Sequence, residues 1–70
     1  MHPRIGSLVR LGPGSNLFYE SSEDISSVIL DDYEYALLLK VTSWCNGIEY
    51  EVLLGNYVMW LLNPEVSEIL

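Results

Sequence analysis

The residue types that most often carry out catalysis are few in this chain, and they are not grouped. The one histidine, His2, lies next to the N-terminus, whereas a general base needs a partner and a cleft. The one cysteine, Cys45, follows Trp44, and its acidic surroundings offer only Lys40 as a nearby cation, which does not favour a reactive thiolate. We interpret His2 as a surface residue and Cys45 as a small apolar packing residue.

Two sets of carboxylates have spacings that chemistry can use. Asp31, Asp32 and Glu34 occupy positions 1, 2 and 4 of a predicted turn, and such oxygen ligands suit a hard cation, but the spacing is not that of a calcium loop. Glu49 and Glu51 lie about 6–7 Å apart on one strand face, and paired carboxylates serve glycosidases. We favour a solvated turn for the first set and a solubilising face for the second, so neither a metal nor a cofactor is expected.

The glycine-rich segment Gly12–Ser15 is expected to be an ordinary loop. It has neither the lysine of a P-loop nor the glycine spacing of a dinucleotide-binding turn. The chain also has no nucleophile motif and little volume for a pocket of about 300 Å³. The sequence therefore predicts no catalytic site, and an enzyme is the class it favours least.

Aromatic side chains are the strongest binding candidates. The chain has two Trp, five Tyr and one Phe, and a core of this size holds about three or four large rings at about 150–250 Å² each. The others are expected to form either a groove for an extended or proline-rich peptide or, as we favour, an interface between subunits. The selected interaction residues are Phe18, Tyr19, Trp44, Tyr57, Met59 and Trp60.

Composition limits the fold and its partners. The 70 residues are half apolar, and ten acids against three Lys and Arg give a formal net charge of −7. The apolar content excludes intrinsic disorder, and the negative charge disfavours binding to phosphate backbones. A chain this short buries only about 60% of its unfolded surface. Some apolar side chains are therefore expected outside the core, where a second copy of the chain would cover them.

The elements that must position these residues are predicted from apolar periodicity, which is mostly two and therefore typical of strands. One strand is expected to place Tyr35, Leu37, Leu39 and Val41 on a single face. Residues 48–54 alternate apolar side chains with glutamates, which predicts a half-buried strand with its acids in water.

The next segment, Tyr57–Leu62, is apolar on both faces, so it is expected in the centre of the sheet or under a partner. Gly55-Asn56 in front of it predicts a two-residue hairpin turn, because both residues tolerate positive φ. Asn46-Gly47 is a second turn-forming pair.

The first half of the chain is less regular. A strand is predicted over Ile5–Leu11, followed by a long loop over Gly12–Glu20. Ser21–Leu30 allows two structures: the start of a helix from Ser22 to Leu39 capped by Ser21, or the first of two strands separated by the acidic turn at Asp31–Asp32. A helix would place Asp32 on its apolar stripe, so we favour the strand.

Five or six short strands separated by turns suit a small antiparallel barrel, formed by residues 1–70 as one domain. The order of segments resembles the small SH3-like β-barrel proteins of phage and bacterial type, although Ser7 stands where an Asp is usual. The matching segments are Ile5–Arg10, Val28–Leu30, Tyr35–Val41, the hairpin Tyr50–Trp60, a short helical turn at Asn63–Ser67 and a terminal strand at Glu68–Leu70. The resemblance implies an all-β, five- to six-stranded SH3-like barrel and no activity.

Together these observations predict a small non-catalytic interaction or structural module that self-associates. A protein or peptide partner is the second expectation, and no nucleic acid or membrane partner is expected. Two alternatives stay open: a nucleic-acid-binding barrel that uses stacking rings, and an acidic nucleic-acid mimic that inhibits a host enzyme, which needs its acids in two rows. Because Met1–Arg10 has no apolar run of signal-peptide length, a cytoplasmic location is expected, in the host cytoplasm if the chain is phage-encoded.

Overall fold

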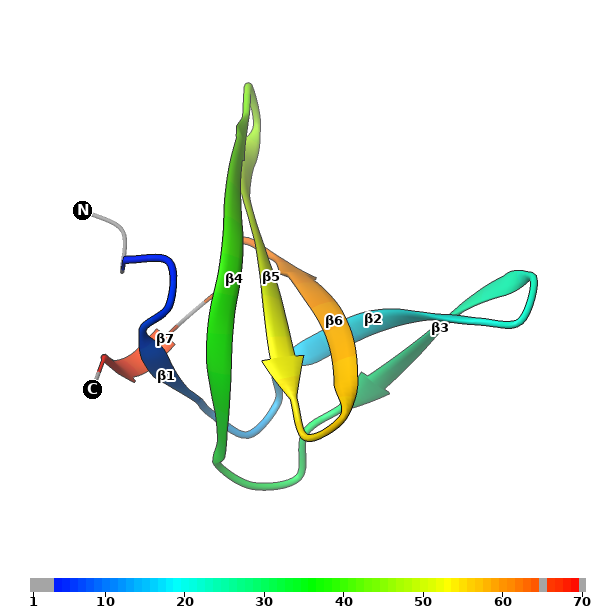
Figure 1. The fold of residues 1–70 in the computed structure, drawn as a ribbon, viewed down its shortest axis with the longest axis horizontal. Coiled ribbons are helices and arrows are strands. Elements are labelled where there is room, and N and C mark those ends of the chain that lie inside the picture. Colours follow the sequence, from blue (N-terminus) through cyan, green and yellow to red (C-terminus); the bar gives the residue numbers. More distant parts are fainter. Residues whose placement is uncertain (1–3, 65, 70) are drawn as a thin grey trace.

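The computed structural model describes residues 4–64 and 66–69, and within them the chain is all-β. Strands follow the order β3-β2-β6-β5-β4-β1-β7 in one antiparallel sheet (Figure 1). The two edge strands, β3 and β7, are not paired with each other in the described region, so the sheet is not closed. The strands are β1 (Leu8–Leu11), β2 (Asn16–Ser21), β3 (Asp24–Ile29), β4 (Glu34–Trp44), β5 (Gly47–Leu54), β6 (Tyr57–Leu62) and β7 (Val66–Ile69).

The β5–β6 hairpin follows the sequence pattern closely. Tyr50 and Val52 are buried, while Glu49 and Glu51 lie on the opposite face, as the alternation predicts. The predicted Gly55-Asn56 turn is confirmed, with Gly55 at a φ of 63° that glycine adopts without a steric penalty. Strand β6 lies between β5 and β2, which explains why it is apolar on both faces.

Strand β4 forms where expected, but its predicted face assignment is wrong. The pairing with β5 shifts between Leu38 and Lys40, so Leu39 is an extra residue in a β-bulge. The core side of β4 therefore consists of Ala36 and Leu38 before the bulge and Val41 after it. Strict alternation would have placed Val41 and Leu38 on opposite faces. Because of the bulge, both lie on the core side.

The predicted loop over Gly12–Glu20 is wrong in its second half, because Asn16–Ser21 is strand β2. It pairs along its whole length with β3, and a two-residue turn at Ser22 and Glu23 joins them. Within the segment Ser21–Leu30, residues 24–29 are therefore a strand, and the helical alternative is excluded. This extra strand raises the number of strands above the five or six expected.

The C-terminal segment differs from the expected helical turn and terminal strand. Ser67, expected in the turn, lies in β7, and no helix occurs among the described residues. The turn also included residue 65, and the terminal strand included residue 70, both of which lie outside the described residues. Strand β7 pairs with β1, so the first and last strands are neighbours.

A short connection forces the sheet to curl. Strands β6, β5 and β4 separate β2 from β1, a distance of about 19 Å in a flat sheet at about 4.8 Å per strand. The chain joins Leu11 to Asn16 through a turn in which the Ser15 N–H and Oγ both donate to the Gly12 carbonyl, at 3.3 and 2.7 Å. Such a turn brings the two strand ends within about 15 Å.

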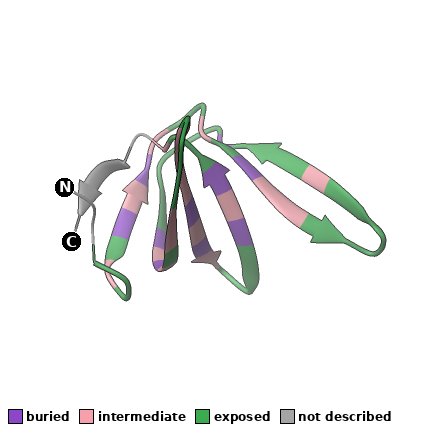
Figure 2. Cartoon of the chain, turned by 90° about the horizontal axis from the view of Figure 1, so that it is seen from above, coloured by how far each residue is buried: buried purple, intermediate pink, exposed green. Residues whose placement is uncertain are grey.

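The core fills the concave side of this curl. Among the residues whose burial is described, 4–64, it contains ten buried apolar residues and no buried polar side chain. In Figure 2 the buried colour is absent from the far part of the β2–β3 hairpin, where β3 is largely exposed and the hairpin end of β2 is exposed. The buried residues are Val9, Leu11, Leu17, Leu30, Ala36, Leu38, Tyr50, Val52, Met59 and Leu61.

Candidate interaction surface

The face of the sheet opposite the core, here called the outer face, carries an apolar row. Leu8 of β1 pairs with Leu37 of β4, Leu37 pairs with Leu53 of β5, and Leu53 pairs with Val58 of β6. Their chain neighbours Val9, Ala36, Val52 and Met59 point into the core, so the row points away from it. Leu8 is 41% and Val58 50% exposed, and the two central leucines are half-buried.

A second row on the outer face combines charge with aromatic rings. Lys40 pairs with Glu51, Glu51 pairs with Trp60, and Trp60 pairs with Phe18 of β2. The Phe18 and Trp60 rings stack with centroids 6.3 Å apart and planes 26° from parallel. The pair Phe18–Trp60 is the one register pair that joins the β2–β3 hairpin to β6, and the ring contact supports that junction.

The structure does not gather the six interaction residues selected from the sequence. Phe18 and Trp60 meet on the outer face, but Met59 is buried and packs in the core. Tyr19 is half-buried and packs against the core from the other side of β2. Trp44 and Tyr57 are exposed at opposite ends of the β4–β5–β6 meander, as Figure 1 allows the reader to follow.

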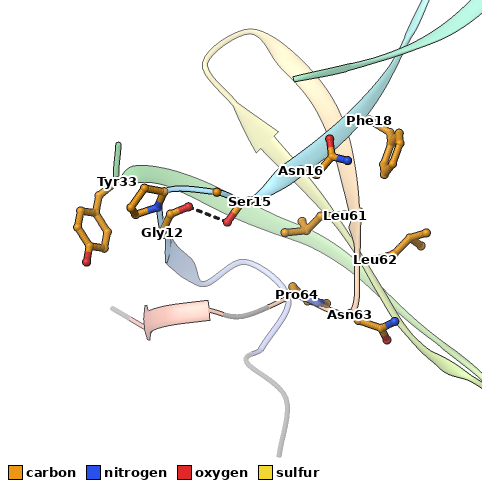
Figure 3. Close-up of a pocket in the computed structure, with 11 residues that line it drawn as sticks. Gly12, Ser15, Asn16, Phe18, Tyr33, Leu61, Leu62, Asn63 and Pro64 are labelled. Atoms are coloured by element: carbon orange, nitrogen blue, oxygen red, sulfur yellow. Dashed lines mark hydrogen bonds between the residues drawn. The ribbon is translucent and has the colours of Figure 1, made fainter. Parts of the chain in front are cut away.

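A hollow of about 790 Å³ lies beside the outer face, where β1 and β2 are not paired. The Gly12–Ser15 loop, the start of β2, Tyr33 and Pro64 line it (Figure 3). The Arg10 guanidinium stacks over the Tyr33 ring, 4.5 Å from its centroid, and holds the β3–β4 loop against β1. Among the described residues that line this hollow there is no His, Cys or acid, and the Tyr33 phenol is one of its polar groups.

The residues considered for catalysis are dispersed. Cys45 is exposed in the β4–β5 turn, so its interpretation as a packing residue is wrong, and His2 lies outside the described residues. Asp32 is an exposed turn residue whose Oδ1 accepts the Tyr33 N–H at 2.7 Å. Across residues 4–64 and 66–69, no three His, Cys, Asp or Glu side chains come together as metal ligands.

The acids with described side chains lie in three separate places. Glu49 and Glu51 are on β5, Asp31, Asp32 and Glu34 surround the β3–β4 loop, and a third group occupies the tip of the β2–β3 hairpin. The mimicry hypothesis needs two phosphate-like rows, which these acids do not form. Glu65 lies outside the described residues.

One titratable group has a shifted pKa. Burial raises the pKa of the Tyr50 phenol above its ordinary value of 10.0, because the charged phenolate loses hydration in the core. Tyr50 lies on the core side of β5, away from the outer face, so the shift reports packing and does not mark a reactive group.

Neither protein-family models, nor curated proteins, nor solved structures give a match to this chain. In the part of the chain that the structure describes, no helix has the length and apolar character needed to cross a membrane. The inferences below therefore rest on the sequence and the geometry of this chain.

Sequence reasoning missed the apolar row because its members come from four strands. Two members were visible in the sequence. Leu53 follows Glu49 and Glu51 on the face of β5 that is otherwise acidic, and Val58 lies in a segment that is apolar on both faces. Leu37 was assigned to the same face as Val41, and the bulge separates them. The four side chains line up only because of the register between neighbouring strands. The sequence of any one strand does not specify that register.

Proposed function

We propose that the protein is a small non-catalytic interaction module of SH3-like architecture that self-associates through its outer face. The apolar row of Leu8, Leu37, Leu53 and Val58 is the observation that carries this proposal. An apolar sheet face is stabilised when a second layer covers it, and within the described residues no helix or strand crosses the outer face.

The SH3-like architecture has its own support. The neighbouring positions of β1 and β7, with β4, β5 and β6 following one another beside β1, agree with the element order that the sequence resemblance implies. The curl of the sheet over one core also agrees with a partly open barrel.

The charges of the second row favour another copy of the chain as the partner. A two-fold axis parallel to the strands, between β4 and β5, stacks two outer faces in aligned sheet packing. Leu37 then faces Leu53 of the second copy, and Lys40 faces Glu51 of the second copy. The two-fold axis repeats each contact. Apolar side chains therefore face apolar ones, and the lysine of each copy faces the glutamate of the other.

The test is the mass of the protein in solution. Analytical ultracentrifugation at micromolar concentration is expected to show twice the chain mass of 8.0 kDa. Leu53→Glu places a charge in the centre of the apolar row and is expected to give the single-chain mass with an unchanged β circular-dichroism spectrum. Tyr57→Ser is the control, because Tyr57 is exposed but lies outside the row. A wild-type protein that sediments as one chain at this concentration would refute self-association.

A further inference from the structure

The edge of the sheet at β3 is a second uncovered surface. Strand β3 ends the strand order, and among the described residues only β2 pairs with it. Five of its six residues are exposed, and Figures 1 and 2 show the β2–β3 hairpin extending away from the rest of the sheet. On such an edge, every second residue directs its N–H and C=O groups away from the neighbouring strand.

This edge lacks the features that protect edge strands from further pairing. Proteins usually block an edge with proline, lysine, a bulge or a very short strand. The sequence of β3, DISSVI, contains no proline and no lysine, and it pairs with β2 through six consecutive register positions without a shift. Its backbone is therefore regular enough to accept another extended chain.

The side chains along the edge define the chemistry of that chain. Ile25 and Ile29 are exposed on the same side of the hairpin, with Val28 on the other side. Acidic residues flank this apolar stretch at both ends, and the sequence has no Lys, Arg or His between positions 11 and 39. The flanking acids are Glu23, Asp24, Asp31 and Asp32.

We propose that β3 binds an extended segment of another protein by adding it to the sheet as a further strand. The fitting segment is about eight residues long, has alternating apolar side chains in its middle and carries Lys or Arg at both ends. Backbone hydrogen bonds to the edge supply affinity, as in other strand-addition complexes. The acids at the two ends select for positive charge. This site uses the backbone edge of β3, apart from the apolar row of Leu8, Leu37, Leu53 and Val58, and does not depend on self-association through that row.

A second copy of the chain fits this edge less well. The antiparallel register that places Ile25 opposite Ile29 of the other copy overlaps five of the six β3 residues, and this apolar contact is favourable. The same register brings the acids before β3, in the turn that ends with Glu23, near the acids after β3 of the other copy, Asp31 and Asp32, and does so twice. Like charges facing each other oppose the pairing, whereas a segment with cations at its ends removes this conflict.

Fluorescence anisotropy of labelled peptides tests the proposal on the intact protein. The probe is an eight-residue peptide with alternating valine and threonine between two terminal lysines. We expect saturable binding, at least about tenfold weaker for the same peptide with terminal glutamates. N-methylation of alternate backbone amides, on the side that faces β3, is expected to abolish it. Equal binding of the lysine and glutamate peptides, or no binding of either, overturns the proposal.

A matched pair of variants locates the site. Ile29→Lys adds a cation to the edge and is expected to weaken binding of the lysine peptide at least about tenfold. Ile5→Lys changes an equally exposed isoleucine, 64% against 61%, away from the hairpin and should leave binding unchanged. The peptide should also bind the Leu53→Glu variant, which separates this site from the outer face. If Ile29→Lys instead changes the sedimentation mass and no peptide binds, β3 pairs with a second copy and the proposal fails.

Discussion

Asn63, just after β6, holds the end of that strand against the start of β5 through two hydrogen bonds to Ile48. Its φ of 47° is left-handed, its N–H donates to the Ile48 carbonyl at 2.6 Å, and its Oδ1 accepts the Ile48 N–H at 3.0 Å. The same side chain occupies the space where a Cβ at position 47 would lie. Gly47 is therefore needed for close approach. The predicted Asn46-Gly47 turn is wrong by one residue, because the turn lies at Cys45 and Asn46 and Gly47 is the first residue of β5.

The first prediction follows from that contact. Gly47→Ala should lower the free energy of unfolding by about 1–3 kcal/mol, because the new methyl group displaces the Asn63 side chain. In an Asn63→Gly background, where the left-handed backbone is kept and the side chain is absent, the same substitution should cost clearly less. Urea unfolding of the four proteins in this double-mutant cycle measures the difference. An equal cost in both backgrounds would mean that Asn63 is not the residue that excludes a larger side chain.

The second prediction concerns Tyr50, whose pKa is raised by burial above 10.0. The folded state keeps the phenol proton at a pH at which the unfolded state has lost it. The stability linked to this group is therefore complete below pH 10 and is lost as the pH rises through the folded-state pKa. Tyr50→Phe should remove this part of the alkaline loss of stability in urea titrations from about pH 8 to 11. Tyr57→Phe, which removes an exposed phenol, is the control variant measured in parallel.

At the scale of elements, the regular part of β4 before the bulge places neighbouring leucines on opposite faces of the sheet. Leu38 is fully buried, and its neighbour Leu37 lies on the outer face. Leu38→Ala should lower the free energy of unfolding by about 2–5 kcal/mol through lost burial and a cavity. Leu37→Ala should cost less than about 1 kcal/mol in dilute protein, because that side chain is only half-buried. Urea unfolding measures both, and a larger effect at Leu37 would contradict the face assignment.

Single elements were predictable where local pattern and pairing agree. The alternation of β5 and the Gly55-Asn56 turn specify their structure without information from elsewhere in the chain. Strand β2 was not predictable, because Pro and two Gly directly precede it and its apolar residues are too few to show a period. The β4 bulge was not predictable either, because an extra residue is defined only by the register of the partner strand.

At the scale of the whole molecule, the two candidate binding surfaces arise from topology. The four-residue β1–β2 connection crosses the β4–β5–β6 meander and curls the sheet, which gives it one filled face and one open face. The residues of the open face are spread over positions 8 to 62 of the chain, so no sequence window contains them. The sequence did predict that an apolar excess would remain outside the core, and the exposed Ile, Leu, Val and aromatic side chains confirm this.

The last prediction tests the arrangement of two copies by a charge exchange. If Lys40 of one copy faces Glu51 of the other, Lys40→Glu and Glu51→Lys each create like-charge contacts and should shift sedimentation toward the single-chain mass. The double variant Lys40→Glu/Glu51→Lys reverses both charges together, restores opposite charges within and between copies, and keeps the net charge of −7. It should recover most of the wild-type association. Because Lys40 and Glu51 are also neighbours within one chain, urea unfolding of each variant controls for a loss of folding. Failure of the double variant to recover association, with its fold intact, would place the second copy in a different orientation on the outer face.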